Sequence, residues 1–203
     1  MKRIMMDLET LATSSDALII SIGAVEFDEA GLGWEFYTVV NQYPQVGKWG
    51  RRRDTKTEKW WSEQGDTAKA VLTESLPESR APDLESALMQ FSEYVAVVNG
   101  GAPGLTATAR TGDNPVYKNV EMWGNGADFD CVILGSAYEA TGLTRPWSYS
   151  NNRCYRTLKN LGIKLDPGTG TAFQGTKHNA LDDAKYQAHY AAAWLRKIKE
   201  MPA

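Results

Sequence analysis

The sequence predicts an α/β fold in which helices flank a mixed β-sheet. Three runs rich in β-favouring residues open the chain, at residues 4–9, 18–27 and 34–40. Helical patterns follow, and a fourth strand is predicted among them at residues 120–123. Strands that come first, and helices that then alternate with a further strand, are typical of a mixed sheet with helices packed on it.

The helices are predicted from the spacing of apolar residues and from the residues that end helices. The predicted helices cover residues 55–63, 66–72, 83–98, 129–141, 153–161 and 180–199. The third is the clearest, because Leu84, Leu88 and Phe91 recur at helical spacing. Gly142 and Gly162 follow the fourth and fifth helices, where glycine commonly ends a helix.

A single domain spanning residues 1–203 is predicted, because no repeat, low-complexity segment or linker divides the chain. Residues 99–115 are rich in Gly, Thr and Pro, and we expect them to form a flexible loop or hairpin insertion.

Composition narrows the classes of function. The net charge of −3 provides no global basic field, so contact with nucleic acid must be local or bridged by metal ions. No run approaches the roughly 18 apolar residues of a membrane span, and the N-terminus does not resemble an export signal. We therefore expect a cytoplasmic protein that does not contact a membrane, with Cys131 and Cys154 as free thiols.

Acidic residues stand in three fragments spread along the chain. The first is Asp7-Leu8-Glu9, at the end of an apolar strand. Residues two apart in a strand share a face, so Asp7 and Glu9 present two carboxylates together, as metal coordination requires. Taken alone, such a pair also fits a solvated strand end.

The second fragment joins the fourth strand to the helix at 129–141. Asp128 is interpreted as the N-cap of that helix and Asn125 as a turn residue. Asp130 then lies in the first helical turn, where a carboxylate is favoured by the helix dipole. These structural interpretations suffice for the fragment by itself.

The third fragment contains His178 and Asp183, which are five residues apart. They share a site only if His178 lies in the loop before the last helix and Asp183 near its start. Asn179 as N-cap, with Asp182 three residues on, resembles a capping box that begins the helix at the required point. The other histidine, His189, lies within the helix and is interpreted as a residue of core or surface packing.

Basic side chains gather beside a pair of tryptophans, Trp60 and Trp61. They are Lys48, Arg51, Arg52, Arg53, Lys56 and Lys59. Arginines next to aromatic rings are suited to hold phosphates and stack bases, although a solvated loop followed by a helix fits the same pattern.

In order and spacing, the three fragments resemble the motifs of the DEDDh 3′–5′ exonucleases, which include oligoribonuclease, ribonuclease T and polymerase proofreading subunits. Asp7 and Glu9 match the first motif, Phe129-Asp130 the second, and His178 with Asp183 the third. The closer resemblance is to the phage and prophage branch called exodeoxyribonuclease VIII-like or Rv2179c-like. It covers nearly the whole chain and rests on these segments: residues 6–10, 19–24, 54–55, 60–61, 123–127 and 178–184.

The resemblance implies a ribonuclease H-like fold, a five-stranded mixed sheet flanked by helices whose second strand is antiparallel. It implies a metal-dependent 3′–5′ exonuclease that releases nucleoside 5′-monophosphates from DNA or RNA. Two Mg²⁺ or Mn²⁺ ions are then held by Asp7, Glu9, Asp130 and Asp183, with His178 as the general base. The expected partners are single-stranded nucleic acid, the 3′ ends of DNA or RNA and, by analogy, a second copy of the chain. Substrate contacts are expected at Thr10, Leu11, Arg53, Trp60, Trp61 and Asn125.

Two other interpretations remain open at this stage. One is a catalytically silent nucleic-acid-binding or interaction domain on the same fold, which would be free to lose one of the five groups, although all five are present. The other is an unrelated α/β protein whose acidic residues are helix caps and solvated ends. The residues favour neither DNA nor RNA.

Overall fold

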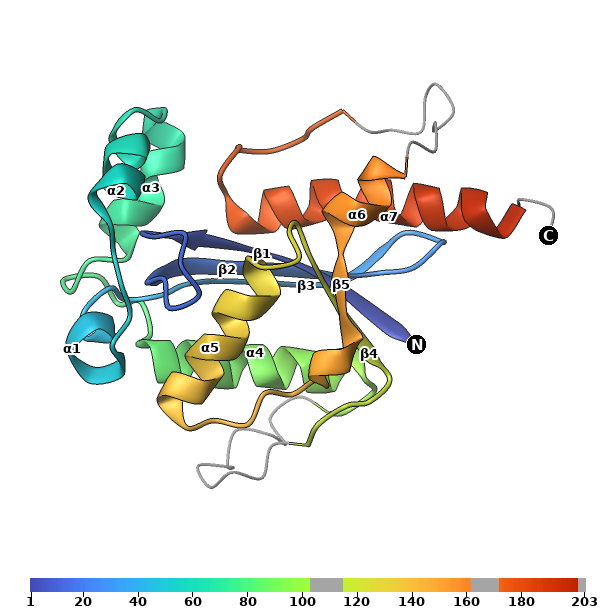
Figure 1. Ribbon diagram of the computed structural model, residues 1–203, viewed down its shortest axis with the longest axis horizontal. Coiled ribbons are helices and arrows are strands. Elements are labelled where there is room, and N and C mark those ends of the chain that lie inside the picture. The colour runs from blue at the N-terminus through green and yellow to red at the C-terminus, as the bar shows by residue number, and fades with distance from the viewer. Residues whose placement is uncertain (103–114, 162–171, 201–203) are drawn as a thin grey trace.

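The computed structural model describes residues 1–102, 115–161 and 172–200 (Figure 1). Its centre is a five-stranded sheet with strand order β3-β2-β1-β4-β5. The strands are β1 (Lys2–Thr10), β2 (Ile19–Phe27), β3 (Leu32–Val39), β4 (Val120–Gly124) and β5 (Asn152–Cys154). β2 pairs antiparallel with both neighbours, whereas β1, β4 and β5 pair in parallel. The mixed sheet, and the antiparallel second strand within it, confirm the predictions.

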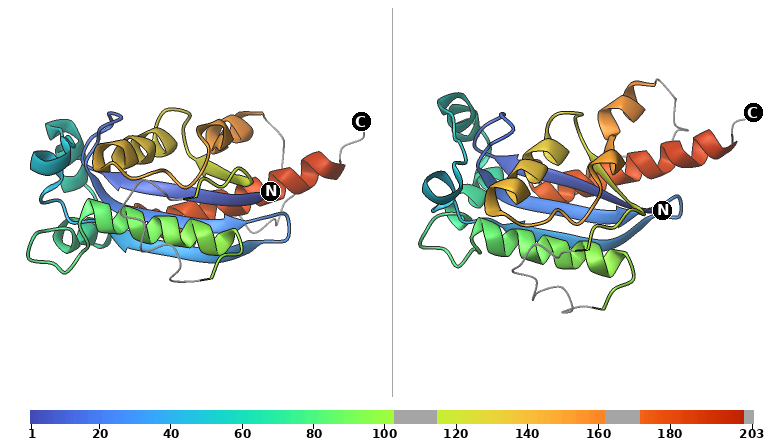
Figure 2. Two further views of the ribbon diagram at one scale, coloured as in Figure 1. Left: turned by 90° about the horizontal axis from the view of Figure 1, so that it is seen from below. Right: turned by 60° about the horizontal axis from the view of Figure 1, so that its bottom comes forward.

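Helices cover both faces of the sheet, as Figures 1 and 2 show. One face carries α4 (Leu84–Val98) and α5 (Asp130–Thr141), and the other carries α6 (Tyr155–Asn160) and α7 (Ala180–Glu200). Side chains along β1 alternate between the faces. Ile4, Met6 and Leu8 pack under α4 and α5, whereas Met5 packs under α7. The same alternation places Asp7 and Glu9 on the α7 face.

Three shorter helices lie at the end of the sheet where β1 finishes. They are α1 (Gln45–Trp49), α2 (Thr55–Ser62) and α3 (Asp66–Glu74). Asp54 caps α2 by accepting a hydrogen bond from the Thr57 amide at 2.8 Å. Trp61 of α2 is buried with Leu11 and Ile20 in a small apolar cluster of its own. This cluster holds α2 against the end of β1.

Gly23 of β2 lies beside Asp7 of β1 and lets α7 begin close to the sheet. A Cβ atom at this position would lie 2.1 Å from the carbonyl carbon of Ala180 and 2.2 Å from the Leu181 nitrogen. Both contacts are with backbone, which has little room to yield. The missing side chain therefore allows the start of α7 to lie close against β2.

The structure corrects several predicted elements. Residues 152–154 form the edge strand β5 and the following helix begins at Tyr155, so the helix predicted at 153–161 is about two residues too long at its start. α1 is not among the predicted helices, because five residues are too few to show a helical period. Of the predicted loop at 99–115, residues 103–114 lie outside the described part, as does the predicted helix stop at Gly162.

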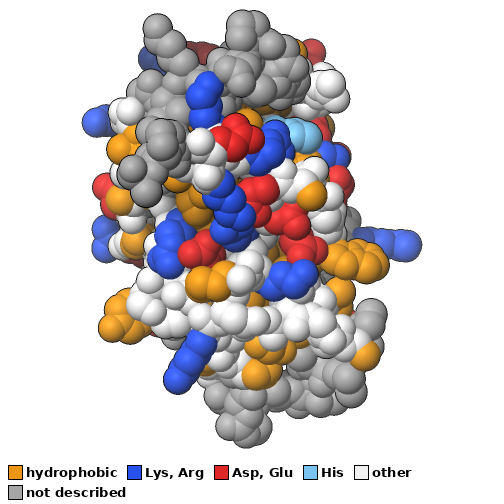
Figure 3. All heavy atoms as spheres, turned by 90° about the vertical axis from the view of Figure 1, so that its right-hand side faces the viewer, with side chains coloured by type: hydrophobic (Ala, Val, Ile, Leu, Met, Phe, Trp, Pro, Cys, Tyr) orange, Lys and Arg blue, Asp and Glu red, His pale blue; other side chains and the backbone are white. Residues whose placement is uncertain are grey.

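The end of the molecule opposite α2 carries acidic and basic side chains interspersed (Figure 3). Arg3 pairs there with Glu29 and Glu121, and Arg153 pairs with Glu121. Among the described residues, no helix is both long and apolar enough to cross a membrane.

Candidate functional site

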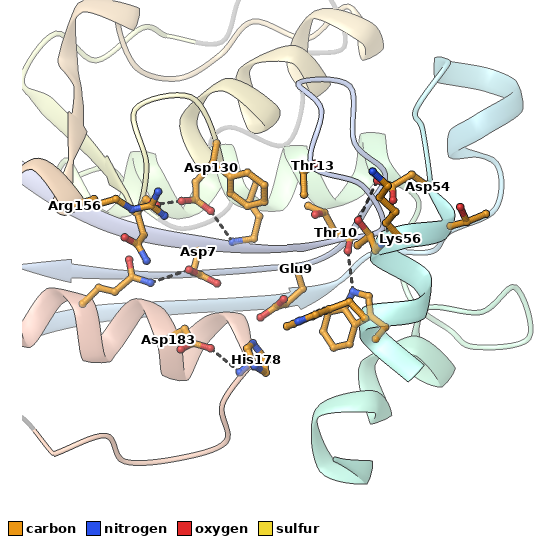
Figure 4. A pocket seen from close by; sticks show the side chains of 18 residues that line it. Asp7, Glu9, Thr10, Thr13, Asp54, Lys56, Asp130, Arg156, His178 and Asp183 are labelled. Atoms are coloured by element: carbon orange, nitrogen blue, oxygen red, sulfur yellow. Dashed lines mark hydrogen bonds between the residues drawn. The ribbon is translucent and has the colours of Figure 1, made fainter. Parts of the chain in front are cut away.

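The first two residues of the site lie near the end of β1. Asp7 and Glu9 are alternate residues of this strand, so both side chains point toward α7 (Figure 4). Asp7 is partly buried and Glu9 is only 8% exposed. Two carboxylates on the face of a central strand are costly to bury unless something positive compensates them.

Asp130 adds a third carboxylate from the first residue of α5, and it is 1% exposed. Its Oδ1 accepts a hydrogen bond from the Leu8 amide at 3.2 Å and its Oδ2 from the Asn125 amide at 2.8 Å. Gly124 permits this approach, because a Cβ there would lie 2.8 Å from the Asp130 Cβ. Asp130 is thereby tied to the strand that carries Asp7 and Glu9.

The N-cap position of α5 corrects the interpretation of Asp128. Phe129 occupies that position and no side chain caps the helix, whereas Asp128 is exposed one residue earlier. The turn is held instead by the Asp130 carboxylate, which folds back onto the Asn125 amide.

The fourth carboxylate and the histidine come from the start of α7. The His178 amide donates to Asp183 Oδ2 at 2.7 Å, and His178 has a left-handed φ of 64°. Non-glycine residues rarely adopt this conformation, and they do so more often at functional sites. Asn179 caps the helix as predicted, accepting from the Leu181 and Asp182 amides. Asp182 does not complete a capping box but accepts from the Thr176 amide.

These side chains converge on one open pocket of about 940 Å³. Asp7, Glu9, Asp130, His178 and Asp183 all line it, although they come from three separate parts of the chain (Figure 4). Glu9, His178 and Asp183 each offer one ligand atom, and these atoms lie within 4.8 Å of one another. The loop position of His178 therefore meets the condition that the sequence set for sharing a site with Asp183.

The electrostatics of the pocket favour protonated carboxyls in the absence of a cation. Burial raises the pKa of Asp7 well above its usual range, and the charges of Asp130, Glu9 and Asp183 raise it further. Burial, followed by the charges of Asp183 and Asp130, raises the pKa of Glu9 to about 8. Burial raises the pKa of Asp130 to about 6 against the opposing hydrogen bonds from Asn125 and Leu8, and burial also raises the pKa of Asp183.

Such a donor set fits divalent cations. Carboxylate oxygens are the ligands that Mg²⁺ and Mn²⁺ prefer, and a cation removes the repulsion that raises these pKa values. The residues present are therefore suited to hold metal.

Two tryptophans wall the pocket beside the histidine. The Trp61 indole N–H donates to the Thr10 carbonyl oxygen at 2.9 Å, which ties α2 to the end of β1. The exposed Trp60 ring lies edge-on to the His178 ring, with centroids 4.8 Å apart. α2 thus contacts both the strand that bears two carboxylates and the imidazole.

Four of the six predicted substrate contacts line the pocket, and two do not. Thr10, Asn125, Trp60 and Trp61 line the pocket. Leu11 is buried in the apolar cluster beneath α2, and Arg53 pairs with Glu58, so both lie outside the described pocket lining.

Three further lining residues were not among the predicted substrate contacts. Lys56 and Arg156 stand on opposite sides of the carboxylates, and Arg156 donates to the Asn125 carbonyl oxygen at 2.8 Å (Figure 4). Gln187 donates to Asp7 Oδ1 at 2.8 Å. Its position four residues after Asp183, on the same helix face, is a signal that could have identified it.

The sequence profile of one protein family, described as the 3′–5′ exoribonuclease Rv2179c-like domain, matches residues 2–195. The chain belongs to this family. The Rv2179c-like part of the resemblance is thereby confirmed, whereas the phage and exodeoxyribonuclease VIII-like assignment stays a prediction. Among curated protein sequences, none matches the chain.

Solved structures support the same fold for this Rv2179c-like domain. The nuclease domain of 3′hExo, a DEDDh family member bound to rAMP, is similar with a TM-score of 0.59 at 14% identity, over 99% of this chain and 94% of that one. Cell-death related nuclease 4 (CRN-4) is similar with a TM-score of 0.54 at 14% identity, over 100% of this chain and 64% of that one. The fold is therefore the ribonuclease H-like fold of DEDDh nucleases.

The raised pKa values predict how the stability of this Rv2179c-like domain, with and without Mg²⁺, depends on pH. Carboxyls with higher pKa values in the folded than in the unfolded protein stabilise the metal-free fold while they are protonated. This stabilisation is complete below about pH 4 and is lost as pH rises through about 6 and about 8, the pKa values of Asp130 and Glu9. Mg²⁺ should therefore raise the melting temperature more at about pH 8.5 than at about pH 6, by roughly 2–4 °C for each kcal/mol of repulsion removed.

Thermal unfolding with EDTA or Mg²⁺ across this pH range measures the effect. Glu9→Gln is the control, because it removes one titrating carboxyl and should flatten the upper part of the dependence. An equal Mg²⁺ effect at both pH values would contradict the prediction.

Proposed function

We propose that the protein is a metal-dependent 3′–5′ exonuclease that releases nucleoside 5′-monophosphates from the 3′ ends of DNA or RNA. The observation that carries this proposal is the convergence of four carboxylates and one imidazole in a single pocket. Membership of an exoribonuclease family supports it. A silent binding domain would have no need to retain all five groups together.

Asp7, Glu9, Asp130 and Asp183 would hold two divalent cations, Mg²⁺ or Mn²⁺. When bound, the cations neutralise the scissile phosphate and stabilise the attacking and leaving oxygens of the displacement. Asp130 contributes a carboxylate fixed by two backbone amides. Asp183 contributes one whose Oδ2 is fixed by the His178 amide.

His178 is the general base in this proposal. Its ring nitrogen lies within 4.8 Å of carboxylate oxygens of Glu9 and Asp183. A histidine side chain can accept the proton of a water that attacks phosphorus near neutral pH. The bond from phosphorus to the 3′ oxygen then breaks, and that oxygen leaves with a proton from solvent.

Other pocket residues are suited to bind the bases and phosphates of a nucleic-acid strand. The Trp60 ring is 41% exposed beside the acidic cluster, where a terminal base can stack on it. Lys56 and Arg156, on opposite sides of the carboxylates, are placed to contact phosphates flanking the scissile one.

The test incubates 5′-labelled single-stranded DNA, single-stranded RNA and duplexes with Mn²⁺, with Asp7→Ala run in parallel. A ladder that shortens from the 3′ end with the native protein, and no digestion by Asp7→Ala, is the expected result. Binding of the strands without cleavage would favour the silent binding domain. Products that retain a 3′ phosphate would contradict the proposed position of bond breakage.

A further inference from the structure

Gln187 is a buried amide that contacts the acidic cluster but carries no charge of its own. It lies one helical turn after Asp183 and is 5% exposed. Its Nε2 donates to Asp7 Oδ1 at 2.8 Å. Its Oε1 is buried and has no hydrogen-bond partner within the described residues. Buried polar atoms are nearly always paired, so this acceptor calls for an explanation.

The orientation of the amide follows from its neighbour. When a cation is bound, Asp7 is ionised and offers only acceptors, so the NH₂ group of Gln187 is the part of the amide that can face it, as it does in the structure. In this orientation, no group of the described residues donates to Oε1. Because Gln187 lines the pocket, a donor for Oε1 can come from the pocket contents.

The backbone around Gln187 fixes this arrangement. α7 begins close against β2 because Gly23 has no side chain. Gly23 is the partner of Asp7 in the pairing of β2 with β1, so the close approach brings Gln187 over Asp7. Gln187 is thus held at the site by packing of the whole helix.

We infer that Gln187 is a positioning residue for the divalent-cation site. Its N–H group holds one oxygen of Asp7, which leaves the other oxygen for the cation. With a cation bound, its unpartnered Oε1 would accept a hydrogen bond from a water molecule held in the site. This inference rests on the proposed function, because it requires that Asp7 be a metal ligand.

Replacing Gln187 with methionine tests the role, because methionine has similar length but neither donates nor accepts strongly. Groups that orient metal ligands typically contribute 10-fold to 100-fold in affinity. The Mn²⁺ concentration at half-maximal thermal stabilisation should therefore rise about tenfold or more. The metal-free melting temperature should stay close to that of the native protein, because the apolar contacts of the helix are kept. A purely structural role would lower the metal-free melting temperature instead.

Two controls complete the experiment. His189→Ala changes an exposed residue two positions further along α7 and should leave the Mn²⁺ midpoint unchanged. Gln187→Asn keeps the amide but has a shorter side chain, so it should weaken Mn²⁺ binding as well. If the methionine variant folds poorly, the Mn²⁺ midpoint of the asparagine variant tests the same role.

The outcomes separate this role from the proposed function. Midpoints within about twofold of the native value in both Gln187 variants would overturn the inference. If Mn²⁺ still stabilised the Asp7→Ala variant, Asp7 would not be a metal ligand, and the inferred role of Gln187 would be wrong as well. Weakened Mn²⁺ binding in the Gln187 variants of a protein that digests no nucleic acid would support the inference and contradict the nuclease.

Discussion

Replacing His178 with alanine should lower the rate of digestion by about 10²–10⁴-fold while largely sparing Mn²⁺ binding. The imidazole is the proposed general base, and none of the proposed metal ligands is removed in this variant. The His178 amide, which holds Asp183, stays in the variant because it belongs to the backbone. The measurement is a single-turnover rate at saturating Mn²⁺, together with the Mn²⁺ midpoint from thermal unfolding.

His189→Ala is the matched control, since it removes the other histidine of the chain from an exposed position on α7. Full activity of the His178 variant would remove this residue from the mechanism. Because the His178 ring lies within the same 4.8 Å cluster as Glu9 and Asp183, loss of Mn²⁺ binding would instead identify it as a ligand.

Gly23→Ala should both destabilise the protein and abolish digestion, although Gly23 lies outside the described lining of the pocket. The new Cβ would lie 2.1 Å from the carbonyl carbon of Ala180, so either β2 or the start of α7 must move. Overpacking of a core typically costs about 1–3 kcal/mol, and a clash between backbones belongs at the upper end of that range. Displacement of α7 separates Asp183 and Gln187 from Asp7, which removes the geometry for cation binding.

Chemical denaturation and Mn²⁺ titration measure these two effects. The matched control is Gly47→Ala in α1, where an added Cβ meets no atom within 4 Å and alanine favours the helix. A Gly23→Ala variant with native stability and an unchanged Mn²⁺ midpoint would contradict the proposed role of this glycine.

Much of the fold is predictable from local patterns. β1, β2 and α4 follow from runs and spacings that are strong within a short window. The short elements α1 and β5 show no such pattern, because they are held by their neighbours in space. β5 pairs with β4 through residues about thirty positions away, a contact that no local pattern contains.

Some features of the candidate site were likewise predictable from local sequence, and others were not. The pairing of His178 with Asp183 follows from the cap at Asn179, because a cap fixes where a helix begins. The role of Asp130 could not be predicted from local sequence, because the Leu8 amide that donates to its carboxylate lies 122 positions away in the chain. Arg53 is as basic as its neighbours in the sequence, yet it forms an ion pair with Glu58 and is not among the residues described as lining the pocket.

The distance along the chain between Asp7 and α7 has a consequence for synthesis. The bond from Gln187 to Asp7 joins residues 180 positions apart. A growing chain exposes Asp7, Glu9 and Asp130 long before Asp183 and His178 have been added. Until the chain has reached His178 and Asp183, the site lacks both its fourth carboxylate and its imidazole. Domains fold as units when enough chain has emerged, so the site, and with it the proposed activity, can form only after residues 178–187 have been synthesised.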